Sequence, residues 1–120
     1  MLHITPQHRL KIAVNALDFR KGIDSIVAFC RNELAQEPFD GYLFAFCNRR
    51  KTSIKLLIYD GNGFWLSQKR FSQGKLKFWP QNETQANKLR AVELLIILQQ
   101  GHPEHARIPL NWRHFPDEVV

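Results

Sequence analysis

The sequence predicts a single α+β domain of 120 residues, an antiparallel β-meander of about four strands plus a short N-terminal strand, packed with two helices. The length suits one folding unit of about 100–150 residues. The apolar spacing changes from a helical period to strict alternation near residue 42, and no repeat or linker interrupts the first hundred residues. We expect one domain over residues 1–120, with a core at about 9–100 and a looser C-terminal tail at 101–120.

The N-terminal third predicts a short strand followed by a helix. Residues 10–14 alternate weakly between apolar and polar side chains, as a short strand does. Beyond Asp18, which could cap a helix, apolar residues recur with helical spacing at Ile23, Ile26, Val27, Cys30 and Leu34. This helix should end before Pro38, because the residue preceding a proline disfavours helical backbone.

Residues 42–79 alternate with a period of two, which predicts the meander. The expected strands are 42–48, 52–60, 64–71 and 75–79. Three-residue loops at 49–51, 61–63 and 72–74 would place one apolar set on a single core face: Phe44, Phe46, Ile54, Leu56, Ile58, Phe64, Leu66, Leu76 and Phe78. The third loop position needs left-handed backbone, which Gly63 and Gly74 adopt freely and Lys51 does not.

A second helix should begin near Asn82 or Thr84, either of which could cap it, and run to about Gln100. Gly101 and Pro103 then end the helical pattern. The tail beyond contains further turn formers, including Pro109, Asn111 and Pro116.

Positive charge is concentrated in the meander. The chain has a net charge of +6, which favours polyanionic partners, nucleic acid first. Residues 49–79 hold eight of the basic residues and a single acid, Asp60. With three-residue loops, Lys55 would lie opposite Lys69, and Lys69 opposite Lys77, in a row across three strands. A phosphate backbone lying on this row would relieve the repulsion between opposed lysines.

We therefore predict DNA contact by the basic meander. The expected phosphate contacts are Arg49, Arg50, Lys51, Lys55, Lys69, Arg70 and Lys77, with Trp65 as the aromatic element. Arg20 and Lys21 are second choices, because they lie near the positive N-terminal end of the first predicted helix. The plainer alternative for these two is an ordinary helix start with two exposed bases.

Two other interpretations of the charged sheet face stay open. Lysines are common on solvated sheets, and a helix could cover the aromatic rings while lysine stems reach outward. Alternatively, the face is a protein-interaction surface that holds a partner without touching DNA, with Tyr59, Trp65 and Trp79 as its hot spots.

No catalytic, metal or cofactor site is predicted. Asp18 and Asp24 have no third carboxylate or histidine at a motif-defined spacing, which disfavours a metal-dependent nuclease. His102 and His105 are separated by Pro103 and lack a recognised ligand partner. Asp60-Gly61-Asn62-Gly63 is interpreted as a turn, since it lacks the ends that calcium and phosphate loops need. Without a signal peptide or a long apolar run, we expect a cytoplasmic protein with no membrane partner.

Several ordered motifs in about residues 9–80 resemble one bacterial family. They are Asp18-Phe19-Arg20-Lys21-Gly22-Ile23-Asp24, Pro38-Phe39-Asp40-Gly41, Leu43-Phe44-Ala45-Phe46, Asn48-Arg49-Arg50, Ile54-Lys55, Tyr59-Asp60-Gly61-Asn62-Gly63-Phe64-Trp65 and Lys69-Arg70-Phe71. The sequence is similar in these motifs to the small accessory protein of the insertion-sequence-66 group of transposons, its second open reading frame product.

The resemblance implies a bacterial protein that is needed alongside a separate transposase and has no assigned catalytic activity or active site. The partners it implies are the transposase of the same element and DNA, reached directly or through that transposase. Family members often have Gly where Lys51 stands, which implies that the hairpin tip differs here. The oligomeric state and the choice between single- and double-stranded DNA stay open.

Overall fold

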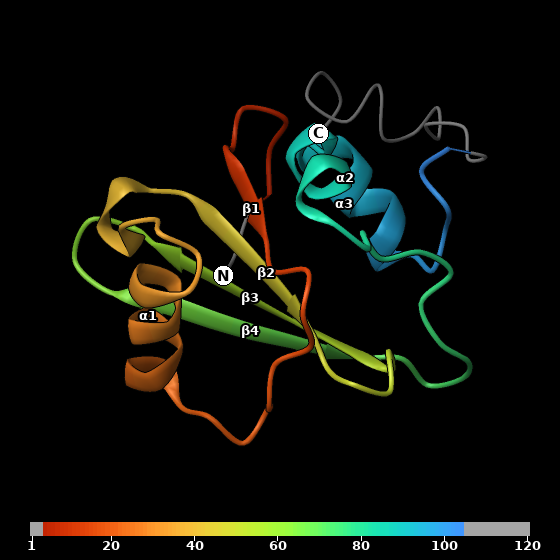
Figure 1. The fold of residues 1–120 in the computed structure, drawn as a ribbon, viewed down its shortest axis with the longest axis horizontal. Coiled ribbons are helices and arrows are strands. Elements are labelled where there is room, and N and C mark those ends of the chain that lie inside the picture. The colour runs from red at the N-terminus through yellow and green to blue at the C-terminus, as the bar shows by residue number, and fades with distance from the viewer. Residues whose placement is uncertain (1–3, 105–120) are drawn as a thin grey trace, which may run out of the picture.

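The computed structural model describes residues 4–104, and its centre is a four-stranded sheet in the order β1-β2-β3-β4 (Figure 1). The strands are β1 (Leu10–Ile12), β2 (Leu43–Cys47), β3 (Ser53–Tyr59) and β4 (Phe64–Arg70). The helices of this part are α1 (Ile23–Asn32), α2 (Glu83–Lys88) and α3 (Ala91–Leu98), with a short 3-10 turn at Pro38–Asp40. Most of the predicted tail, residues 105–120, lies outside the described residues.

The sheet is mixed, because β1 pairs parallel with β2 while β2, β3 and β4 are antiparallel. A parallel pair needs a crossover connection of a dozen or more residues, and residues 13–42 supply one that carries α1. The α+β class is therefore confirmed. The prediction of a meander with a separate N-terminal strand did not include this parallel pairing.

Helices cover both faces of the sheet. On one face, Ile26, Val27 and Cys30 of α1 pack against Phe44, Phe46 and Leu57. On the other face, α2 and α3 pack against the intervening side chains of the same strands, among them Leu43, Ala45, Ile54 and Leu56. Figure 1 shows the sheet between α1 on one side and the α2–α3 pair on the other. Because both faces are apolar, consecutive residues such as Leu56 and Leu57 are both buried.

The predicted register is wrong by one residue in both hairpins. Tyr59 pairs with Phe64, and Cys47 pairs with Ile54, so even-numbered connections replace the predicted three-residue loops. Phe44 and Ile54 consequently lie on opposite faces rather than sharing one core. The cause is the burial of both faces, since alternation fixes a register only where one face is polar.

Residues 75–79 do not form the predicted fourth meander strand. The Leu76 N–H donates to the Lys51 carbonyl, and the Gln100 side-chain amide donates to the carbonyls of Gln73 and Lys75. These bonds take the place of strand pairing while the chain crosses toward α2. The buried Trp79 ends the crossing, and its indole N–H donates to the Ala13 carbonyl at 2.9 Å.

Two details of the predicted helices also differ. The second helix is divided into α2 and α3, because Leu89 and Arg90 have extended backbone. Of the two predicted caps, Asn82 and Thr84, the structure uses Asn82, whose side chain accepts from the Gln85 N–H at 2.8 Å. Asp18 does not cap the first helix: α1 begins at Ile23 after Gly22, which has no side chain to cap it.

The two cysteines are free and fully buried, one in α1 and one in β2. Burial raises the pKa of Cys30 to about 12 and that of Cys47 to about 11. At pH 8 we expect the native protein to react with a thiol reagent roughly a hundredfold or more slowly than the denatured chain, because thiolate is the reactive form. Unfolded thiols ionise near pH 8.5, so the fold should also lose stability as the pH rises past that value. Timed thiol labelling with and without denaturant tests this, and rapid native labelling would contradict it.

Candidate nucleic-acid interface

Two basic segments that are distant in the sequence border one groove. The groove has a volume of about 620 Å³ and lies between residues 16–21 and the β2–β3 hairpin tip at residues 48–50. Four exposed cationic side chains line it, together with the carboxylate of Asp18: Arg20, Lys21, Arg49 and Arg50. We call the hollow bordered by these four cations the basic groove. Its excess of positive charge suits an anionic ligand.

Asn48 braces the hairpin tip that carries two of these cations. Its side-chain oxygen accepts hydrogen bonds from the backbone N–H groups of Thr52 and Ser53, at 2.9 and 3.1 Å. Its amide nitrogen donates to the Thr52 hydroxyl at 2.9 Å. The tip also contains Lys51 at φ 61°, the left-handed backbone that the sequence predicted to be demanding for a lysine. Arg49 and Arg50 are therefore carried by a fixed turn.

Lys55 anchors the other wall of the groove. It lies in the middle of β3, is only 7% exposed, and donates from its ammonium group to the Phe19 carbonyl at 2.7 Å. The same ammonium lies 5.0 Å from the centre of the Phe19 ring. The backbone preceding Arg20 and Lys21 is thereby tied to the sheet. Lys55 is a positioning residue here rather than a surface contact.

Asp18 forms an ion pair within the groove wall. Its carboxylate accepts from the Arg20 guanidinium at 2.8 Å and from the Arg20 backbone N–H at 3.0 Å. These hydrogen bonds from Arg20, first the side chain and then the backbone, hold the pKa of Asp18 well below its usual range. The pair fixes the Arg20 side chain while leaving it 92% exposed. Lys21, Arg49 and Arg50 remain as the excess positive charge of the groove.

The predicted row of lysines is wrong. Because the register is shifted by one residue, Lys55 lies opposite Gln68 and Lys69 lies opposite Ile54, on different faces of the sheet. The Lys69 ammonium donates to the Leu98 carbonyl at the end of α3, at 2.7 Å. Lys77 lies outside any strand and lines a second cavity, together with Lys51.

The other predicted contacts are scattered as well. Arg70 is exposed and pairs with Ser53, at the sheet end that carries the hairpin tip and on the same face as Lys55. Trp65 lies near the opposite end of β4, is 42% exposed, and donates from its indole to Asp60 at 2.7 Å. The structure thus gathers Arg20, Lys21, Arg49 and Arg50 at one groove and separates Lys69 and Trp65 from it.

The aromatic residues predicted as protein-interaction hot spots do not share one surface. Tyr59 and Trp65 lie on opposite faces of the sheet, since Tyr59 pairs with Phe64 and Trp65 with Ile58. Trp79 is only 6% exposed. The exposed aromatic side chain that the sequence argument overlooked is Phe39, 48% exposed, whose ring packs 4.7 Å from that of Tyr59.

Sequence reasoning also missed the residues that organise the groove. Asn48 directly precedes the turn, a position where its side chain commonly bonds the following backbone, and this signal was available. Nothing in the sequence links Lys55 to Phe19, which are 36 positions apart. In the described residues, no three histidine, cysteine or acidic side chains are placed to hold a metal ion. None of the helices in residues 4–104 could span a membrane.

Comparison with known proteins identifies similar sequences. A family model described as IS66 Orf2 like protein matches residues 8–107. The uncharacterized protein y4hO of Sinorhizobium fredii is 31% identical over 111 residues, which cover 92% of this chain and 87% of that protein. The uncharacterized protein y4jC of the same organism is 33% identical over 72 residues, which cover 60% of this chain and 62% of that protein, less than two thirds of its length. No solved structure matches.

Proposed function

The chain belongs to the IS66 Orf2-like family of insertion-sequence accessory proteins, and from that premise we propose that it is a noncatalytic transposition factor that binds DNA through the basic groove. The observation that carries the proposal is the meeting of two basic segments at one hollow. Arg20 and Lys21 precede α1, whereas Arg49 and Arg50 follow β2. Phosphate groups are the anions that such a family would meet on a transposon.

The hydrogen bonds that hold the two walls of the basic groove are consistent with DNA binding. Lys55 and Asn48 each use a side chain to fix one wall, so the walls carry their cations on ordered backbone. Preorganised cations lose less entropy when a ligand binds. Such contacts position a protein on DNA without reading its sequence. We therefore expect binding of low sequence specificity by this chain alone.

Charge neutralisation tests the proposal. We expect the double variant Arg49→Gln/Arg50→Gln to bind duplex DNA roughly 10- to 100-fold more weakly near 0.1 M salt. The slope of log affinity against log salt should become shallower by about 2, because each lost phosphate contact contributes about 0.9. Fluorescence anisotropy over a salt series measures both quantities.

The control is the variant Lys75→Gln/Lys88→Gln, which removes the same charge from exposed side chains outside the groove. It should leave the affinity and the slope close to those of the unchanged protein. Equal losses in both double variants would show that net charge, rather than the groove, determines binding.

A second candidate function is binding of the transposase of the same element without DNA contact. The observation that favours it is the exposed ring of Phe39, which packs against Tyr59 and Phe64 at one end of the sheet. Exposed aromatic rings are enriched at protein interfaces. The test is a pull-down of the transposase by this protein, with and without nuclease treatment. Binding that persists after nuclease treatment and is lost in Phe39→Ala would support this candidate. Binding that nuclease treatment abolishes would favour the DNA proposal.

A further inference from the structure

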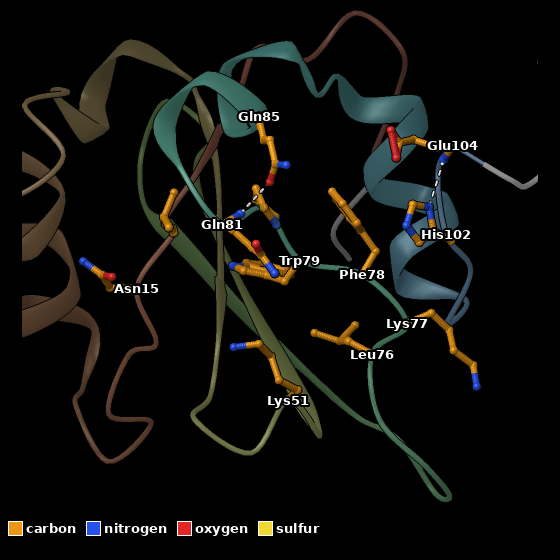
Figure 2. A pocket seen from close by; sticks show the side chains of 12 residues that line it. Asn15, Lys51, Leu76, Lys77, Phe78, Trp79, Gln81, Gln85, His102 and Glu104 are labelled. Atoms are coloured by element: carbon orange, nitrogen blue, oxygen red, sulfur yellow. Dashed lines mark hydrogen bonds between the residues drawn. The ribbon is translucent and has the colours of Figure 1, made fainter.

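A second cavity is lined by side-chain amides and aromatic rings, together with Lys51, Lys77, His102 and the carboxylate of Glu104. Its volume is about 660 Å³, within the range of about 300–1,000 Å³ typical of small-molecule sites. Figure 2 shows Gln81 and Gln85 beside Trp79 and Phe78, with Lys51 on the other side of the cavity and Asn15 at its edge, apart from the others. We call it the amide cavity.

The exposed side-chain amides of Asn15 and Gln81 have no hydrogen-bond partner within residues 4–104. Gln85 uses its side-chain oxygen to accept from the Gln81 backbone N–H at 2.8 Å. The half-buried Phe78 ring, which packs 4.8 Å from the ring of His102, provides an apolar wall, with the edge of the buried Trp79 behind it. Amides offer paired donors and acceptors that match the edges of nucleobases. Apolar ring surface beside them suits the flat face of a base.

The amide cavity adjoins the basic groove at two points in the chain. Lys51 lines the cavity and directly follows Arg49 and Arg50, which line the groove. Asn15 lines the cavity and directly precedes Ala16, which lines the groove. A DNA strand whose phosphates lie in the groove would therefore pass next to residues that line the cavity. In Figure 2 the Lys77 side chain points away from Trp79, so Lys51 is the cation nearer the cavity centre.

We propose that the amide cavity receives the base of an unpaired nucleotide from a DNA strand whose neighbouring phosphates occupy the basic groove. The inference rests on the proposed function, because it assumes that the groove binds DNA. A fully paired duplex keeps its bases stacked and cannot supply one without an energetic cost of unstacking. The preferred ligand is therefore DNA with a single-stranded end or gap.

The test compares one duplex in three forms: blunt, with a three-nucleotide single-stranded overhang, and with the same overhang lacking bases. We expect the unchanged protein to bind the normal overhang about tenfold more tightly than the blunt form, and the abasic overhang no better than the blunt form. The variant Asn15→Ala/Gln81→Ala should lose this preference and retain the affinity and salt dependence for blunt duplex. The control Asn87→Ala/Gln99→Ala changes one exposed Asn and one exposed Gln outside the cavity and should keep the preference.

Each result decides the matter. Equal binding of blunt and overhang DNA by the unchanged protein would overturn the cavity inference and leave the groove proposal standing. An abasic overhang that binds as well as the normal one would show that added phosphates, not a base, give the preference, and would also overturn it. Lack of binding to all three forms would overturn the groove proposal together with the inference. Retained preference in Asn15→Ala/Gln81→Ala would exclude the amide cavity as the site.

Discussion

Replacing Trp79 by alanine is expected to lower the free energy of unfolding by about 3–5 kcal/mol, the usual cost of deleting a buried large aromatic side chain. The Trp79 ring packs in the core between the sheet and α2–α3, and its N–H bonds to the Ala13 carbonyl 66 positions away. The loss would therefore destabilise the whole fold rather than one binding surface. Chemical denaturation monitored by circular dichroism measures it.

The matched control is Trp79→Phe, which keeps most of the ring and loses the indole N–H. We expect it to cost about 1–3 kcal/mol, because the buried Ala13 carbonyl then lacks its donor. Suppose instead that Trp79→Ala left the free energy of unfolding unchanged and lowered the affinity for a protein partner. Trp79 would then be an interaction hot spot, and its assignment to the core would be wrong.

Lys55→Glu should cost about 3–5 kcal/mol, as expected for an uncompensated buried charge. The new carboxylate would lie beside the Phe19 carbonyl, which can accept a hydrogen bond but cannot donate one. Lys55 is also only 7% exposed, and its neighbour on β2 is the fully buried Phe46. The same denaturation experiment measures the loss.

The variant Lys55→Met distinguishes a structural role of Lys55 from a direct contact of its charge with DNA. Methionine has a similar shape and no charge, so the Phe19 carbonyl loses its donor while no charge remains to be buried. The free energy of unfolding should fall by at most about 1–3 kcal/mol, less than in Lys55→Glu. The salt dependence of DNA binding should stay the same, because the Lys55 ammonium contacts Phe19 instead of a phosphate. The affinity should fall modestly, since the segment carrying Arg20 and Lys21 loses its anchor. A slope shallower by about 1 would instead assign Lys55 a direct phosphate contact.

The sequence predicted the helices and strands well in segments where apolar residues recur with a single period. The stripe from Ile23 to Cys30 identified α1, and the positions of β2, β3 and β4 were each right to within two residues. Register failed because β3 is buried on both faces, including the polar Ser53 and Lys55, so its alternation did not show which face meets α1. The parallel pairing of β1 with β2 could not be predicted from the sequence either. It depends on the path that residues 13–42 take between the two strands, which alternation within a strand does not show.

The candidate groove was predicted in its parts but not in its assembly. Arg49 and Arg50 were found as a basic hairpin tip, and Arg20 and Lys21 as a separate basic cluster. Local charge density reveals such clusters, whereas their meeting depends on tertiary packing of α1 against the sheet. Lys69 illustrates the opposite error: the sequence shows its charge, but its hydrogen bond to Leu98 exists only after α3 has packed.

The strand order repeats the order of the chain, and this bears on how a growing polypeptide assembles. During translation, β2, β3 and β4 can be added one after another, each beside the strand made just before it. The layer formed by α2 and α3 is synthesised after all four strands. Until it leaves the ribosome, the side chains of Leu43, Ile54 and Leu56 have no cover, so nascent chains that end before residue 83 should be ready targets for chaperones.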